Sequence, residues 1–92
     1  MKKAYEIRIY GRVFNVGFRR YVYRFATEND IAGYVENDWT DESVHIIAEG
    51  EEKDLDRFCI LCGEGTPYSL VTNMKIEPRK ISGNYKEFKQ IR

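Results

Sequence analysis

Apolar and polar residues alternate near the start of the chain and then change to a helical spacing. In residues 5–10 apolar side chains occupy every second position, which is the period of a half-buried strand, and Gly11 ends the clean alternation. From Phe18 apolar residues recur at i, i+4, i+7 and i+8, so they share one face of a helix. The pattern predicts a strand up to Gly11 and a helix from Phe18 to about Asn29.

The rest of the chain repeats the change from strand to helix. Residues 31–37 and 43–50 are β-rich runs separated by the polar stretch DWTDE, which predicts a hairpin. Acidic residues then precede an apolar stripe at helical spacing, and glycines and a proline end this second helix. Residues 68–78 alternate again and predict a strand ending at Pro78, whereas residues 85–92 carry only a weak strand signal.

The predicted order of elements is β-α-β-β-α-β. Its compact solution is an antiparallel sheet with both helices on one face, an α+β arrangement of the ferredoxin-like kind. The chain has 92 residues, and we expect residues 1–92 to form a single domain around one core. Because metal carriers, RNA-binding proteins, regulatory domains and enzymes share this fold, it does not by itself indicate a function.

The overall composition excludes several kinds of partner. The 15 basic and 15 acidic residues cancel, so no basic surface for nucleic acid is predicted and no nucleic-acid partner is expected. The N-terminal residues lack a signal-peptide core, and no stretch is long and apolar enough to span a bilayer. These features favour a cytoplasmic protein without a membrane partner, and one site in so small a domain gives no reason to expect more than a monomer.

The charges are unevenly distributed along the chain. Every charged residue from position 7 to position 27 is an arginine, whereas carboxylates dominate residues 28–56, where Lys53 is the only base. A run of like charges is usually a solvated face. Three roles stay open for the acidic block 28–56: repelling anions, contacting a partner, or keeping a small domain in solution.

Cys59 and Cys62 are the only cysteines. Two thiols without further cysteine or histidine ligands nearby cannot complete a tetrahedral zinc site. Both lie on the apolar stripe of the second predicted helix, so we predict buried thiols that pack in the core rather than a redox pair.

The segment GRVFNVG, residues 11–17, connects the first strand to the helix that begins at Phe18. The loop and the first helical turn present N–H groups without helical partners at the positive end of the helix dipole, an arrangement that binds anions. Arg19 adds a planar guanidinium that suits two phosphate oxygens. The sequence therefore predicts a site for phosphate or a similar anion.

The same segment resembles the signature of the acylphosphatase family, whose usual form reads Gly-x-Val-Gln-Gly-Val-x-Phe-Arg. A second stretch, residues 33–58, is similar to the family's second block, in which Gly-x-Val-x-Asn opens the hairpin and an acidic helix follows. The resemblance covers nearly the whole chain, and the predicted order of elements is the family's own fold. The first motif is matched at Gly11, Val13, Val16, Phe18 and Arg19.

The resemblance implies hydrolysis of small acyl phosphates to a carboxylate and inorganic phosphate. In the family, loop amides and the motif arginine hold the phosphate, and the asparagine of the second block, here Asn37, positions the attacking water. Fixed N–H donors, one arginine and a held water can perform this chemistry, so no metal or other cofactor is required. The residues implicated in phosphate binding are Val13, Phe14, Asn15, Val16, Gly17, Phe18 and Arg19.

Other polar residues have simpler interpretations. From spacing alone, Asn37 followed by aspartate is common turn chemistry at a strand end, and only the resemblance favours a role in water positioning. We predict Arg12, Arg20 and Arg24 to be surface charges that tune the local field. His45 is predicted to be an exposed or half-exposed strand residue without a neighbouring carboxylate, and so a poor catalytic candidate.

Two positions depart from the family pattern. Phe14 stands where glutamine is usual and Asn15 where glycine is usual. Asparagine tolerates a positive φ best after glycine, so the loop backbone can still close. The bulk of both side chains could nevertheless narrow the pocket. The alternative to a hydrolase is therefore a catalytically silent, acylphosphatase-like module that binds anions.

Overall fold

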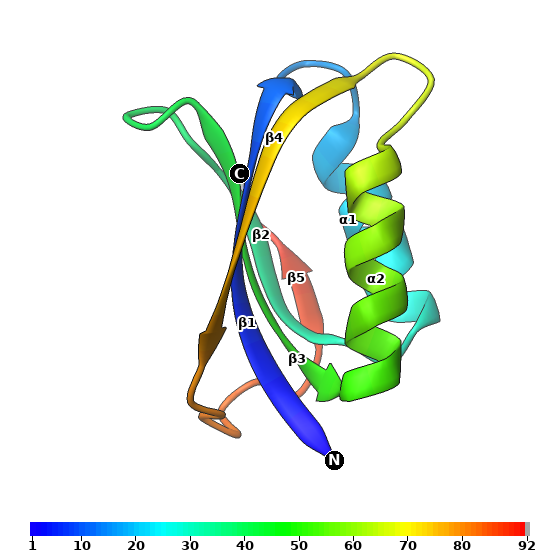
Figure 1. Cartoon of the computed structure of the whole chain (residues 1–92), viewed down its shortest axis with the longest axis vertical. Helices are drawn as coiled ribbons and strands as arrows, with labels where there is room; N and C mark the ends of the chain where they lie inside the picture. The colour runs from blue at the N-terminus through cyan, green and yellow to red at the C-terminus, as the bar shows by residue number, and fades with distance from the viewer. Residues whose placement is uncertain (92) are drawn as a thin grey trace.

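The computed structural model describes residues 1–91 and shows the predicted order of elements followed by one short additional strand (Figure 1). The elements form one five-stranded sheet in the order β4-β1-β3-β2-β5, with both helices on one face. The predicted α+β fold with its two layers is confirmed. The strands are β1 (Lys2–Arg12), β2 (Ala32–Asp38), β3 (Ser43–Glu51), β4 (Leu70–Arg79) and β5 (Phe88–Gln90), and the helices are α1 (Phe18–Glu28) and α2 (Glu52–Glu64).

The C-terminal strand makes the sheet mixed rather than purely antiparallel. β5 pairs in parallel with β2, with Gly33 opposite Phe88, whereas the other pairs are antiparallel. Phe88 is the only buried residue of β5, so this strand has little alternation of apolar and polar residues in the sequence. The ring of Phe88 packs edge-on against that of Phe58 in α2. The chain leaves β4 at one edge of the sheet and returns at the other, which brings Ile91 to the start of α1.

The core lies between the sheet and the two helices. Alternate residues of β1 and β3, among them Ile7 and Ile46, are fully buried against the apolar faces of α1 and α2. Phe18, the first residue of α1, is only 2% exposed, and burying such a side chain contributes about 1.5–3 kcal/mol. This burial fixes the start of α1 beneath the loop that precedes it. Within residues 1–91, no helix is long and apolar enough to cross a membrane.

Both cysteines lie in this core as free thiols, as predicted. Burial raises the pKa of Cys59 to about 11 and raises the pKa of Cys62 well above its ordinary value. The thiolate, which redox chemistry and metal binding require, is therefore disfavoured at both positions.

Candidate active site

The loop between β1 and α1 has the backbone of an anion cradle. Asn15 and Gly17 have φ angles of 60° and 75°, in the left-handed region. Left-handed residues in a tight loop turn successive N–H groups toward one side, where together they can bind an anion. Asn15 thus adopts the backbone that glycine would favour, at a cost of about 1 kcal/mol.

The N–H groups of this loop and of the first helical turn are unoccupied. In the described part of the chain, no backbone carbonyl accepts from the N–H groups of residues 14–20, and the first bond into α1 runs from Tyr21 N–H to Gly17 O at 3.2 Å. Gly17 is the N-cap and has no side chain to occupy these donors. Among the predicted phosphate-binding amides, that of Val13 donates inside the loop, to Gly11 O at 3.0 Å.

Arg19 lies in the first turn of α1 and is half-buried. A basic side chain opposes the helix dipole at this end by about 0.3–1 kcal/mol, and this first turn contains no acid to compensate it. Such a local conflict is typical of a binding site. Arg19 Nη1 donates to Ile91 O at 2.7 Å, a contact that orients the guanidinium from the opposite end of the chain.

Asn37 is the penultimate residue of β2, and its Oδ1 is buried without a hydrogen-bond partner among residues 1–91. An unsatisfied buried acceptor costs about 1–3 kcal/mol, so its retention calls for an explanation. The turn role is filled by the next residue instead. Asp38 Oδ1 accepts from Thr40 N–H at 3.1 Å, from Thr40 Oγ1 at 2.6 Å and from Asp41 N–H at 3.2 Å.

Arg19, Asn37 and the loop line one cavity of about 270 Å³. Its walls come from the β1–α1 loop, the first turn of α1, the end of β2 and β5, which are far apart in the sequence. A larger cavity of about 400 Å³ beside β5 contains none of the predicted site residues. The residues lining the smaller cavity are Val13, Asn15, Gly17, Phe18, Arg19, Arg20, Asn37 and Gln90.

The remaining arginines of the segment divide into two groups. Arg20 is exposed but lines the cavity, so it contributes to the field at the anion site. Arg12 and Arg24 are exposed and lie outside the cavity, where we interpret them as surface charges. Phe14 is also absent from the cavity lining, because its ring packs against Trp39 with a centroid distance of 4.5 Å.

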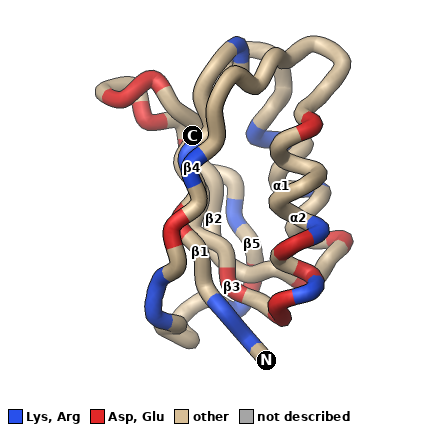
Figure 2. Tube along the Cα trace, in the orientation of Figure 1, with Lys and Arg blue, Asp and Glu red and all other residues tan. Residues whose placement is uncertain are grey.

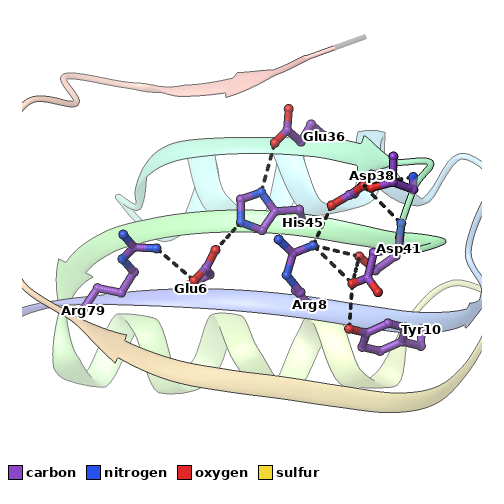
Figure 3. Close-up of polar contacts among 10 residues, drawn as sticks. Glu6, Arg8, Tyr10, Glu36, Asp38, Asp41, His45 and Arg79 are labelled. Atoms are coloured by element: carbon purple, nitrogen blue, oxygen red, sulfur yellow. Dashed lines mark hydrogen bonds and ion pairs between the residues drawn. The ribbon is translucent and has the colours of Figure 1, made fainter.

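The β2–β3 hairpin that carries Asn37 is held by a polar network on the helix-free face of the sheet (Figure 3). Arg8 Nη1 donates to Asp38 Oδ2 at 2.9 Å and to Asp41 Oδ2 at 3.3 Å. Tyr10 Oη donates to Asp41 Oδ2 at 2.8 Å. Hydrogen bonds from Thr40 and Arg8 lower the pKa of Asp38 to about 2. The network fixes the strand end from which Asn37 projects into the cavity.

The expectation for His45 is wrong. It is only 7% exposed, and both ring nitrogens contact carboxylates: Nε2 lies 2.6 Å from Glu6 Oε2 and Nδ1 lies 3.0 Å from Glu36 Oε2 (Figure 3). Glu6 lies on β1, Glu36 faces His45 across the β2–β3 pair, and neither is near it in the sequence. His45 does not line the cavity of Arg19 and Asn37, so its role is in the sheet network.

The acidic block of residues 28–56 does not form one surface. Figure 2 shows acidic residues at the tip of the β2–β3 hairpin and a separate group of them around the N-terminus of α2, at the other end of the molecule. Only the hairpin group, which includes Asp38, Asp41 and Glu42, lies next to the strand end that carries Asn37. The two groups therefore cannot form one continuous surface for a partner.

The polar network predicts a loss of stability in acid. Folding lowers the pKa of Asp38, mainly through Thr40, and that of Glu6, mainly through His45. A carboxylate whose pKa is lowered by folding stabilises the protein above its ordinary pKa, and this contribution disappears as the pH falls through the folded value. We expect the urea midpoint to fall steadily from about pH 5 to about pH 2.

Asp38→Asn should be less stable than the parent protein at neutral pH and should show a smaller further loss in acid. Equal urea midpoints of the parent protein at about pH 5 and about pH 2.5 would contradict this interpretation.

The left-handed loop position gives a second prediction. Asn15→Ala should lower the free energy of unfolding by about 1 kcal/mol, because alanine is strained at a φ of 60°, whereas Asn15→Gly should leave it nearly unchanged. Urea unfolding measures both. An alanine variant as stable as the glycine variant would show that the loop does not need this backbone conformation.

Comparison with known proteins agrees with this geometry. The family model described as acylphosphatase matches residues 5–90. An acylphosphatase of Staphylococcus haemolyticus is 37% identical over 97% of this chain and 99% of its own length, and one of Thermotoga petrophila is 42% identical over 94% and 93%. The crystal structure of acylphosphatase from Bacillus subtilis superposes with a TM-score of 0.92 at 34% identity, covering 100% of both chains. The chain therefore belongs to the acylphosphatase family of hydrolases.

Proposed function

We propose that this protein hydrolyses small acyl phosphates through the cavity shared by the β1–α1 loop, Arg19 and Asn37, without a metal or other cofactor. The observation that carries the proposal is the meeting of three kinds of group in one space. The cavity is lined by a loop with unoccupied N–H donors, a guanidinium, and an amide oxygen with no partner among residues 1–91. The first two suit a phosphate, and the third suits a water molecule.

The loop and Arg19 bind the phosphate of the substrate. The N–H groups of residues 14–18 donate to its oxygens, and the guanidinium of Arg19 adds a planar pair of charged donors. Arg20 and the positive end of α1 add favourable potential. These donors are fixed before the substrate arrives, so they stabilise the charge that spreads over the phosphoryl oxygens in the transition state.

Asn37 orients the attacking water. Its Oδ1 accepts a hydrogen bond from the water, whose oxygen forms a bond to phosphorus in line with the bond to the acyl oxygen that breaks. The leaving carboxylate departs with the bonding electrons and is a weak base, so it needs no general acid. The proton of the water ends on the inorganic phosphate. No covalent intermediate with the protein forms.

The two departures from the family pattern are compatible with this activity. Asn15 adopts the left-handed backbone in place of glycine. The ring of Phe14 packs on Trp39 and does not line the cavity, so it leaves the anion site open. These observations favour the hydrolase over the silent anion-binding module. We also propose that the protein acts as a single-domain monomer in the cytoplasm on a small-molecule substrate, with Arg19 and Asn37 lining one cavity of the chain.

The test is hydrolysis of benzoyl phosphate by the purified protein at neutral pH with a metal chelator present. We expect multiple turnovers, and we expect the double reversion Phe14→Gln with Asn15→Gly to change kcat/KM by less than about tenfold. Turnover only after the reversion would favour the silent module. Turnover that requires added metal would contradict the cofactor-free mechanism.

A further inference from the structure

Phe14 and Trp39 form an exposed aromatic pair that binding of phosphate does not explain. Their ring centroids lie 4.5 Å apart with an interplanar angle of 50°. Phe14 is half-buried and packs against the core, whereas Trp39 remains 63% exposed even with this partner. Exposed tryptophan and other aromatic side chains are frequent among the residues that dominate binding surfaces, so this pair is a candidate contact surface.

The aromatic pair belongs to two segments that also line the phosphate cavity. Phe14 lies between Val13 and Asn15, which both line the cavity. Trp39 lies in the turn that follows β2, two residues after Asn37, and its ring contacts Phe14. The β1–α1 loop and the hairpin tip lie at the same end of the molecule (Figure 1). The aromatic pair thus lies on the two segments that flank the cavity, close in sequence to residues that line it.

The position of Trp39 is fixed by its neighbours. Asp38 accepts hydrogen bonds from Thr40 and Asp41 and from the guanidinium of Arg8, so the turn that carries the indole is held on both sides (Figure 3). A rigid aromatic surface loses little conformational entropy when it binds a ligand. The aromatic pair is thus suited to binding one kind of group selectively.

The charges at the hairpin limit what this surface can accept. Glu42 is exposed in the same turn as Trp39, and its carboxylate would repel a negatively charged acyl group, whereas the carboxylate of Asp41 is bonded to Arg8 and Tyr10. An uncharged aromatic acyl group would instead pack on the rings of Phe14 and Trp39. The arrangement combines attraction for one kind of acyl group with repulsion of another.

We propose that Phe14 and Trp39 are the acyl-binding surface of the site and select uncharged aromatic acyl phosphates over small aliphatic or acidic ones. The proposal rests on the proposed function, because it assumes that the phosphate of the substrate occupies the neighbouring cavity. It also gives Phe14 a role in this chain, at the position where glutamine is usual in the family.

The first experiment compares kcat/KM for benzoyl, acetyl and succinyl phosphate. Benzoyl phosphate should be the best substrate and succinyl phosphate the poorest. Trp39→Ala should lower the ratio of benzoyl to acetyl kcat/KM by about tenfold, since stacking on one aromatic side chain contributes about that much, and Trp39→Phe should restore most of it. Ile60→Ala is the control, because Ile60 on α2 is also 63% exposed and should leave the ratio unchanged.

A second measurement separates this inference from the proposed function. Benzoylphosphonate and acetylphosphonate resist hydrolysis, and Trp39 is the only tryptophan, so its fluorescence reports contact with the acyl group directly. Quenching by benzoylphosphonate and about tenfold tighter calorimetric binding than acetylphosphonate, lost in Trp39→Ala, would support the inference even if neither acyl phosphate is hydrolysed. Equal affinities, a preference that survives Trp39→Ala, or succinyl phosphate as the best substrate would overturn it.

Discussion

Replacing Arg19 by alanine is expected to lower kcat/KM for acyl phosphate hydrolysis by about 10³- to 10⁴-fold, or about 4–5.5 kcal/mol of transition-state stabilisation. Arg19 is the half-buried arginine that lines the cavity, and its guanidinium is held by Ile91 O at 2.7 Å. Its charge stands among fixed N–H donors at the positive end of α1, where developing phosphoryl charge would otherwise be only partly compensated.

The stability of this variant should not fall with its activity. Among residues 1–91 the side chain makes one hydrogen bond, to Ile91, and it stands at the helix end where a positive charge is unfavourable. The thermal midpoint of Arg19→Ala should therefore stay within a few degrees of the parent value. Arg19→Lys should recover only part of the activity, because an ammonium group keeps the charge but not the planar fork.

Steady-state kinetics with benzoyl phosphate and circular dichroism on the same preparations measure both effects. Arg24→Ala is the matched control, because Arg24 is an exposed arginine of the same helix outside the cavity. Activity of Arg19→Ala equal to that of the Arg24→Ala control would remove Arg19 from the mechanism.

Features that depend on local pattern could be predicted from the sequence. The alternation in β1 and the helical spacing after Phe18 predicted both elements closely, and most apolar residues at those positions are buried, with Tyr5 and Phe25 half-buried. Asparagine tolerates left-handed backbone, and Asn15 has the positive φ that this tolerance allows. A short loop between a strand and a helix is determined largely by the residues within it.

Features that depend on sheet register or on distant segments could not be predicted. His45 gains two carboxylate partners because strand pairing places Glu6 and Glu36 beside it, and no spacing in the sequence reports that pairing. The parallel β5 has one buried residue and so almost no pattern. For the same reason Ile91, which lies 72 residues from Arg19, could not be identified as its partner.

The effect of Phe14 can be judged only from the local sequence pattern together with a contact between distant segments. Its sequence position predicted a ring that narrows the pocket, because the position belongs to the loop motif. The structure instead turns the ring toward Trp39, a residue of the hairpin within the second motif. Only the contact between the two motifs shows that bulk at position 14 lies beside the anion site.

Asn37→Ala should lower the activity of the protein without lowering its stability. We expect kcat to fall by about 10²- to 10³-fold with KM little changed, because the phosphate is held by other groups and only the orientation of the water is lost. The free energy of unfolding should stay the same or rise by up to about 1 kcal/mol, because alanine removes a buried acceptor that has no partner among residues 1–91.

Asn37→Asp tests the same position by adding a negative charge to the cavity. A carboxylate in the cavity would repel the phosphate bound by Arg19, so KM should rise as well as kcat fall. Asn73→Ala on the exposed strand β4 is the control for both variants and should not change activity. If Asn37→Ala lost stability and activity together, the side chain would be a structural residue of the hairpin, and the water would have to be held elsewhere in the cavity. If it lost activity while gaining stability, the unpaired Oδ1 would be a group kept at the expense of folding for the chemistry of the site.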